Sequence, residues 1–91
     1  MSEWKKARKR DIDISFREVE PLTQLYKNAY TGELSKVCKG PEWFPVEGEV
    51  ICTLEGEDYA TPENDFIICG VHGELYPLKK YIFNETYKVV E

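Results

Sequence analysis

The residues whose types allow covalent chemistry lie close together in the last third of the chain: Cys69, His72 and Glu74. A thiol, an imidazole and a carboxylate are the groups that a cysteine hydrolase uses as nucleophile, base and orienting group. His72 is the single histidine of the 91 residues, and it lies at the expected tip of a hairpin. Side chains three positions apart on an extended strand point to opposite faces. The spacing therefore predicts no catalytic residues, and a small hydrolase that uses Cys69 or acidic residues is kept as a second alternative.

Carboxylates offer a second kind of chemistry, the binding of a cation. Asp11 and Asp13 are two positions apart on one expected strand, with no third ligand nearby. A polar, turn-rich region adds four more acidic residues: Glu55, Glu57, Asp58 and Glu63. This region lacks the Asp-x-Asp-x-Asp-Gly spacing of a calcium loop. We interpret both sets as solvated surface and predict neither a metal nor a cofactor.

The three cysteines are Cys38, Cys52 and Cys69. Their odd number and wide spacing argue against a disulfide framework and against a zinc site. The chain has no run of 18 apolar residues, and its basic start is not followed by the apolar stretch of a signal peptide. These features predict free thiols in a cytoplasmic protein without a membrane span.

Basic residues crowd the start of the chain, beside a tryptophan. The set is Trp4, Lys5, Lys6, Arg8, Lys9 and Arg10. Residues 1–17 hold six basic and three acidic side chains, a net charge of +3, although the whole chain has a net charge of −5. We interpret residues 1–10 as a basic arm and residues 11–91 as one domain. The arm is either a solvated tail whose Trp4 packs on the domain or, as the first alternative function, a nucleic-acid-binding module with Trp4 stacked on a base.

Large aromatic residues in an expected loop are the candidates for binding a partner. Residues 39–48 contain two prolines and two glycines, which is typical of a loop. Trp43 and Phe44 inside it form either an exposed recognition patch, together with Tyr76, or a plug over the open end of the core. A small chain needs its large apolar side chains for the core, so the plug is favoured, and the patch stays the binding hypothesis.

The elements that must position these residues follow from the pattern of apolar side chains. Alternation predicts a strand over 11–17, and the spacing of Leu22, Leu25 and Ala29 predicts a helix over 21–30. Further strands are expected at 34–38, 49–55, 65–78 (a hairpin) and 87–90, a helical turn at 79–85, and a polar loop at 56–64. The predicted fold class is α+β, a small, mainly antiparallel bent sheet or open barrel of about five strands with one packed helix.

The hairpin is the centre of this prediction. Its first strand is apolar on both faces, which indicates a strand covered on both sides. His72-Gly73 separates the two apolar runs, and Gly73 allows the positive φ of such a turn. Gly70 marks a bulge or a close backbone approach, and Pro77 requires the second strand to end or to lie at an edge.

The same stretch carries a resemblance. The motifs Asp65–Ile68, Gly70-Val71, Gly73-Glu74, Tyr76-Pro77 and Ile82-Phe83 with Thr86-Tyr87 resemble the C-terminal part of small phage, prophage and archaeal proteins of unknown function, some of which have a Pro-Gly-Asp-Tyr-Gly signature. This chain has Glu63-Asn64 where Pro-Gly would precede Asp65. The resemblance implies a phage or mobile-element origin and no established activity.

Together these features predict a small cytoplasmic binding or interaction protein. A protein partner or self-association fits the uneven distribution of charge. Nucleic acid is the weaker expectation, and no membrane is expected.

Overall fold

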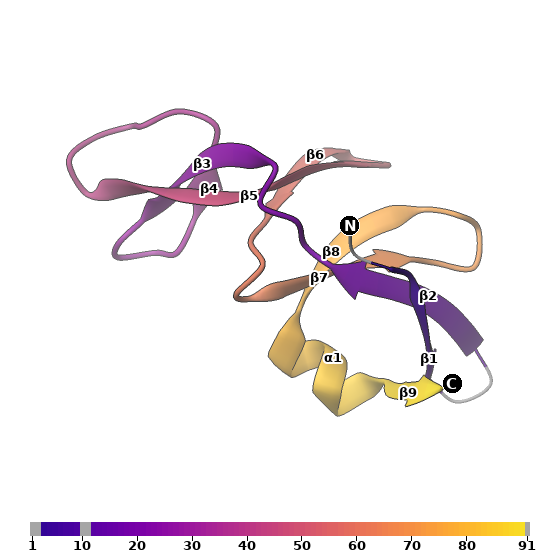
Figure 1. The fold of residues 1–91 in the computed structure, drawn as a ribbon. Helices are drawn as coiled ribbons and strands as arrows, with labels where there is room; N and C mark the ends of the chain where they lie inside the picture. Colours follow the sequence, from indigo (N-terminus) through magenta and orange to yellow (C-terminus); the bar gives the residue numbers. More distant parts are fainter. Residues whose placement is uncertain (1–2, 10–11, 91) are drawn as a thin grey trace.

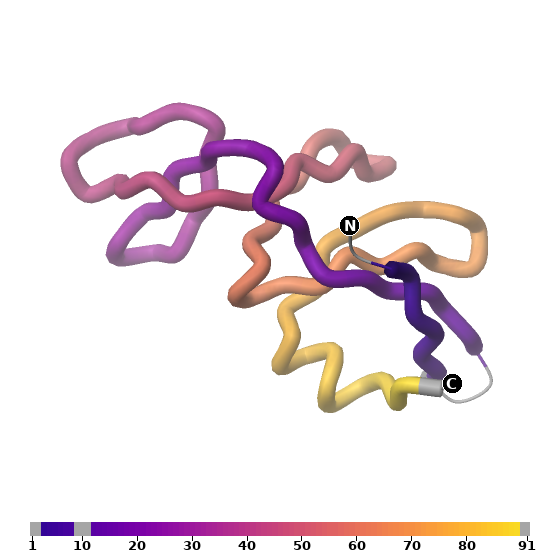
Figure 2. The backbone as a smooth tube through the Cα atoms, viewed as in Figure 1, coloured from indigo at the N-terminus to yellow at the C-terminus, as the bar shows by residue number. Residues whose placement is uncertain are grey.

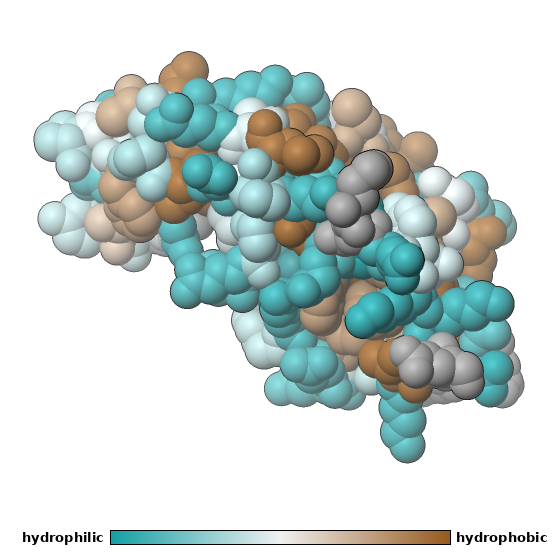
Figure 3. Space-filling view, in the orientation of Figure 1, coloured by the Kyte–Doolittle hydropathy of each residue, from teal (hydrophilic) through white to brown (hydrophobic). Residues whose placement is uncertain are grey.

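The structure is a computed structural model that describes residues 3–9 and 12–90. Within this part of the chain, nine strands form two antiparallel sheets, and one helix accompanies them (Figure 1). The molecule is elongated, with principal extents of 45 × 25 × 22 Å. In Figure 3 the four-stranded half lies at the upper left and the five-stranded half at the lower right.

The five-stranded sheet has the order β8-β7-β2-β1-β9. Its strands are β1 (Lys5–Lys9), β2 (Ile12–Glu18), β7 (Asp65–Cys69), β8 (Leu75–Lys79) and β9 (Lys88–Val90). The strands expected near 11–17 and 87–90 are thus confirmed. The N-terminal region differs from the expected arm, because β1 pairs with both β2 and β9 and lies inside the sheet. Pairing with two neighbours holds this basic segment in the domain.

One face of this sheet is closed by helix α1 (Lys80–Thr86), which confirms the helical turn expected at 79–85. Phe83 of the helix packs on buried residues of three strands: Ala7, Ile14, Phe16 and Ile68. The ring centroid of Phe83 lies 4.5 Å from the ring centroid of Phe16 and 4.9 Å from that of Phe66. Paired residues of neighbouring strands share a face, so this aromatic core defines the helix face of the sheet.

The opposite face is only half covered. Ile67 points there and packs with Val19, which directly follows β2, and with Ile51 and Ala60 of the four-stranded half; Leu75 lies against this cluster. Ile67 and its neighbour Ile68 are both fully buried, on opposite faces of β7. The prediction that this strand is covered on both sides is confirmed. The strands β2, β1 and β9 lie farther from β8, and this half of the face carries mainly charged residues.

The four-stranded sheet has the order β4-β3-β5-β6. Its strands are β3 (Thr23–Asn28), β4 (Leu34–Ser35), β5 (Trp43–Thr53) and β6 (Gly56–Ala60). Figure 2 shows that the chain leaves the five-stranded sheet once after β2 and returns once before β7, so this sheet is a single insertion. The short strand expected within 34–38 is confirmed at its first two residues.

The helix expected over 21–30 is wrong, because Thr23–Asn28 forms strand β3. Six residues of β3 pair with β5, from Thr23 opposite Gly48 to Asn28 opposite Trp43. The proposed apolar stripe does not form one face: Leu25 is fully buried, whereas Leu22 is exposed. Long-range backbone pairing and the burial of Leu25 outweigh a local helical pattern in a segment this short.

Two expected loops are strands in part. Trp43–Gly48, within the expected loop 39–48, is the first half of β5, and Gly56–Ala60, within the expected loop 56–64, is β6. Pro45 fits β5 because β6 pairs only with the later segment from Glu49 to Thr53. One edge of the strand is therefore free at Pro45, where a missing backbone N–H is tolerated.

The hairpin expected over 65–78 is confirmed, with a longer turn than two residues. β7 and β8 pair from Asp65 opposite Lys79 to Cys69 opposite Leu75. Gly73 has φ 81°, as the turn requires. A Cβ at Gly70 would clash with the Glu74 carboxylate, so this glycine permits the expected close approach. Pro77 lies in β8, an edge strand of its sheet, in agreement with the prediction.

Candidate functional site

The open half of the five-stranded sheet displays a tryptophan and several cations side by side. Lys6 pairs with Ser15 and Arg8 with Asp13, while Lys88 of β9 pairs with Arg8. Trp4 directly precedes β1 and shares the face of Lys6 and Arg8 by the two-residue repeat of a strand. We call the surface formed by Trp4, Lys6, Arg8, Asp13, Ser15 and Lys88 the open face.

Trp4 is held at one end of the open face by an arginine. The Arg17 guanidinium lies 5.3 Å from the centroid of the Trp4 ring, which is the distance of a cation–π contact. The tryptophan is nevertheless 47% exposed. A large aromatic ring that is both fixed and half exposed is suited to stacking against a planar ligand.

Arg17 is in turn fixed by a carboxylate of the other sheet. Its Nη1 and Nη2 donate to Glu49 Oε1 and Oε2 at 2.7 and 2.6 Å, and both side chains are largely buried. Glu49 Oε1 also accepts from the backbone N–H of Glu20 at 2.9 Å. These bonds hold the pKa of Glu49 below its usual value, chiefly through the bond from Arg17, and raise the pKa of Arg17. The pair thus connects the two sheets.

The open face is cationic but not uniformly so. Arg8 Nε donates to Asp13 Oδ1 at 2.6 Å, in a pair that is half exposed on both sides. The hydrogen bond between them lowers the pKa of Asp13 and raises the pKa of Arg8. A small hollow of about 140 Å³ lies beside Lys6 and is also lined by Ser15, Cys69 and Gly70.

The structure divides the basic residues singled out in the sequence. Trp4, Lys6 and Arg8 lie together on the open face. Lys5 pairs with Phe16 and so belongs to the helix face. Arg10, the Lys9 side chain and Asp11 lie outside the described residues. Sequence reasoning missed Arg17 and Lys88; the alternation of strand 11–17 gives the face of Arg17, but nothing local indicates that β9 lies beside β1.

Two of the three side chains considered for nucleophilic catalysis, Glu74 and Cys69, form hydrogen bonds within the hairpin itself. Glu74 Oε1 accepts from the backbone N–H of His72 at 3.1 Å, and its carboxylate lies against Gly70. His72 is exposed. Cys69 is half-buried and its Sγ donates to the Gly70 carbonyl at 3.9 Å. The hydrogen bonds of Glu74 and Cys69 are thus with the backbone of the turn between β7 and β8.

The three aromatic residues of the binding hypothesis lie in different places. Trp43 is only 8% exposed and begins β5, with Lys39 Nζ 5.2 Å from its ring centroid. Tyr76 lies on the helix face of the other sheet, where burial first, and then Tyr87, raise its pKa to about 12. Phe44 is 43% exposed. The structure thus does not bring the three together as one patch.

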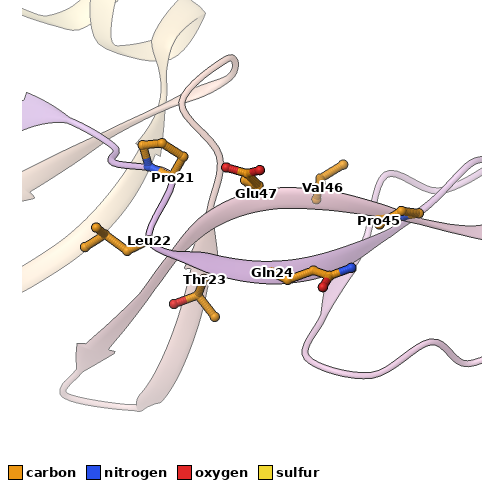
Figure 4. A pocket seen from close by; sticks show the side chains of 7 residues that line it. All are labelled: Pro21, Leu22, Thr23, Gln24, Pro45, Val46 and Glu47. Carbon is orange, nitrogen blue, oxygen red and sulfur yellow. The ribbon is translucent and has the colours of Figure 1, made fainter.

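Among the described residues, two hollows are lined by residues of both β3 and β5. Phe44 borders a crevice of about 420 Å³ against the turn 61–64, which is also lined by Lys27, Val46, Glu47 and Pro62. A shallower hollow of about 770 Å³ is shown in Figure 4. Its side chains are spread along β3, the two residues before it and β5, and they do not converge on a common centre, as the positions of Gln24, Pro45 and Val46 show. Neither hollow combines an exposed ring with a group of like charges, as the open face does.

Within 3–9 and 12–90, no three His, Cys, Asp or Glu side chains are placed to hold a metal ion. In the same part of the chain, no helix combines the length and the apolar character needed to cross a membrane.

The fold and the open face together define a small antiparallel α+β protein with one unpartnered, cationic sheet surface. Comparisons with protein-family models, with curated protein sequences and with solved structures find no significant match. The resemblance of the C-terminal third to small phage proteins therefore stays a prediction.

Proposed function

We propose that this chain is a small binding protein whose ligand is single-stranded nucleic acid, bound on the open face. The observation that carries the proposal is Trp4, a half-exposed ring that is held by Arg17 and directly precedes strand β1, which carries Lys6 and Arg8. Proteins that bind single strands combine aromatic stacking platforms with a cationic surface that follows the backbone. The open face offers both on one side of one sheet.

The distribution of charge supports the same surface. Residues 20–63, which form the four-stranded half, hold three basic and nine acidic side chains, a net charge of −6, whereas residues 1–19 have a net charge of +2. Phosphate is repelled by the acidic half and attracted by the open face. An overall net charge of −5 is thus compatible with an anionic ligand, provided that the ligand stays on the open face.

The test is a titration of a fluorescein-labelled oligothymidylate with the full-length protein at low salt, followed by fluorescence anisotropy. Deleting residues 1–10 is not a useful variant, because it removes strand β1 from the sheet. Trp4→Ala and Lys6→Glu are the variants of choice, since both positions are exposed. Stacking of one base contributes about 1–3 kcal/mol, so we expect W4A to weaken binding roughly tenfold.

Matched controls lie on the other half of the molecule. Lys27→Glu makes the same charge change on β3, and Trp43→Phe alters the other tryptophan; both should bind like the parent protein. The proposal is rejected if the parent protein does not bind the oligonucleotide at low salt. It is equally rejected if W4A and K6E bind as tightly as the parent protein.

A second candidate function is self-association, which the opposite charges of the two halves favour. In this arrangement the acidic four-stranded half of one copy docks on the open face of another. Such a contact is heterologous and produces open-ended assemblies. Sedimentation velocity at increasing protein concentration should then show larger species at low salt that disappear at about 0.5 M salt, where charges are screened beyond a few ångströms. A single monomeric species at all concentrations excludes it.

We also propose that the protein works in the cytoplasm. Cys38 and Cys52 are exposed and, like Cys69, are free thiols. Exposed free thiols suit a reducing compartment. Trapping the three thiols by alkylation in intact cells, followed by mass spectrometry, tests this: full alkylation supports it and oxidised cysteine contradicts it.

A further inference from the structure

We infer that Glu49, a residue of the four-stranded sheet, is a positioning residue for the Trp4 stacking platform of the five-stranded sheet. The inference rests on the proposed binding of a single strand at the open face. It concerns how Glu49, which is not part of the open face, sets the orientation of Trp4 there. Glu49 and Arg17 are 32 positions apart in the chain, and only folding brings them together.

Arg17 is held by hydrogen bonds from its guanidinium to Glu49 and to the backbone. Both terminal nitrogens of the guanidinium donate to the Glu49 carboxylate, and Nη1 also donates to the Glu18 carbonyl at 3.1 Å. A two-pronged guanidinium–carboxylate pair fixes the plane of the cation as well as its position. The carboxylate is itself fixed by the backbone N–H of Glu20. Arg17 therefore has one well-defined orientation.

Arg17 in turn connects this ion pair to the tryptophan. Trp4 precedes the first residue of β1, so the backbone ladder that orders Lys5–Lys9 begins just after it. The guanidinium of Arg17 lies over its ring. The indole can stack on a planar cation whose plane is fixed. The orientation of Trp4 thus depends on Arg17, and the orientation of Arg17 depends on Glu49.

Removing the charge of Glu49 changes the affinity for nucleic acid in opposite directions under two views of its role. Glu49 is an anion near a cationic face, so a purely electrostatic view predicts that removing its charge strengthens the binding of nucleic acid. Positioning predicts the opposite, because an Arg17 that has lost its partner no longer holds the ring in place. The substitution Glu49→Gln therefore distinguishes the two views by direction and not only by size.

The experiment uses W43F protein, in which Trp4 is the only tryptophan. Circular dichroism first confirms that each variant is folded. We expect E49Q to weaken binding of the labelled oligothymidylate about fivefold. In the absence of oligonucleotide, we expect its Trp4 emission to shift to the red and to be quenched more strongly by acrylamide. Glu55→Gln is the matched control, since Glu55 is an exposed residue in the turn after β5 and the substitution makes the same change in charge; it should leave the emission unchanged and bind at least as tightly as the parent.

A second variant protects the test against misfolding of E49Q. Arg17→Lys keeps the positive charge and removes the two-pronged geometry and the planar surface, so it should reproduce both the weaker binding and the red-shifted emission. The inference is overturned if E49Q and R17K fold, and both keep the emission of the parent and bind as E55Q does. That result leaves the proposed function intact as long as W4A is defective. If no protein binds the oligonucleotide, the proposed function fails, and unchanged Trp4 emission in E49Q and R17K overturns the positioning as well.

Discussion

The two faces of the five-stranded sheet come from the same strands and differ in what covers them. On the helix face, the rings of Phe16, Phe66 and Phe83 lie within 5.2 Å of one another, centroid to centroid, and close the core. On the opposite face, the four-stranded half covers Ile67 and ends there, so that Lys6 and Arg8 remain exposed. The comparison shows that the exposed, cationic surface of this sheet, which we propose as the binding surface, begins where the apolar cover ends.

The difference arises from alternation along single strands. In β1, Ala7 is fully buried on the helix face, while its neighbours Lys6 and Arg8 are exposed on the other. In β2, Ile14 and Phe16 are buried in the same way. A strand has a repeat of two residues, so a single segment supplies an apolar core to one side and a charged surface to the other.

The largest expected effect concerns the covered face. Replacing Phe83 with alanine should destabilise the protein by about 3–5 kcal/mol, because the change removes a buried ring and leaves a cavity among aromatic neighbours. Urea unfolding followed by circular dichroism measures it. Tyr81→Ala, an exposed residue of the same helix, is the control and should have little effect. Equal losses for the two variants would mean that the helix does not close this face.

The next effect concerns the contact between the two sheets. E49Q should lower the free energy of unfolding at pH 7 by about 2 kcal/mol, because it leaves Arg17 with an incomplete partner. The pKa of Glu49 is lowered in the folded protein, so its contribution is present above the unfolded value of about 4.3 and is lost as the pH falls through the folded value. The stability difference between parent protein and E49Q should thus shrink below about pH 4.

Asp13 is the control for this pH profile. Its pKa is also lowered, by Arg8, but the pair is half exposed at the surface. Surface pairs contribute little to stability, so Asp13→Asn should follow the acid unfolding curve of the parent protein. A stability difference for E49Q that stays constant from pH 7 to pH 3 contradicts the assignment of the ion pair.

A smaller effect is expected in the salt dependence of binding, which reports how many cations of the open face contact phosphate in the proposed complex. If Lys6, Arg8 and Lys88 each contact one phosphate, the logarithm of the binding constant should fall with the logarithm of the salt concentration with a slope of about −2, since each contact contributes roughly 0.7 for single strands. Lys88→Gln should reduce the magnitude of this slope by about 0.7. Lys36→Gln, on the four-stranded half, should leave it unchanged, and equal slopes for K88Q and the parent protein would remove β9 from the site.

The smallest effect is the protection of a thiol. Cys69 lines the hollow beside Lys6, so bound oligonucleotide should slow its reaction with a maleimide in the C38S/C52S protein. The C38S/C69S protein keeps only Cys52, which lies on β5 of the other half, and should react at the same rate with and without oligonucleotide. Protection of Cys52 alone would place the ligand on the four-stranded half.

The sequence predicts those parts of the fold whose signal is local. Alternation over 11–17 and the paired apolar runs of the hairpin 65–78 predict strands. The structure confirms them as Ile12–Glu18, Asp65–Cys69 and Leu75–Lys79. Gly73 and Pro77 predict the turn and the edge strand. The helix predicted over 21–30 is wrong because the apolar spacing of this segment fits a helix as well as a strand. Only the backbone pairing of Thr23–Asn28 with β5 makes it a strand.

For the candidate site, the sequence by itself determined which residues are present: a tryptophan, a group of cations next to it, and a strand of alternating polar and apolar residues that follows. The tertiary structure decided which of them share a face, because β1 is placed between β2 and β9 by hydrogen bonds to residues at both ends of the chain. It also decided that a carboxylate from a second sheet fixes the arginine that lies over the Trp4 ring. Side-chain alternation is a local property of the backbone, whereas contacts across 32 positions exist only after two sheets have packed together.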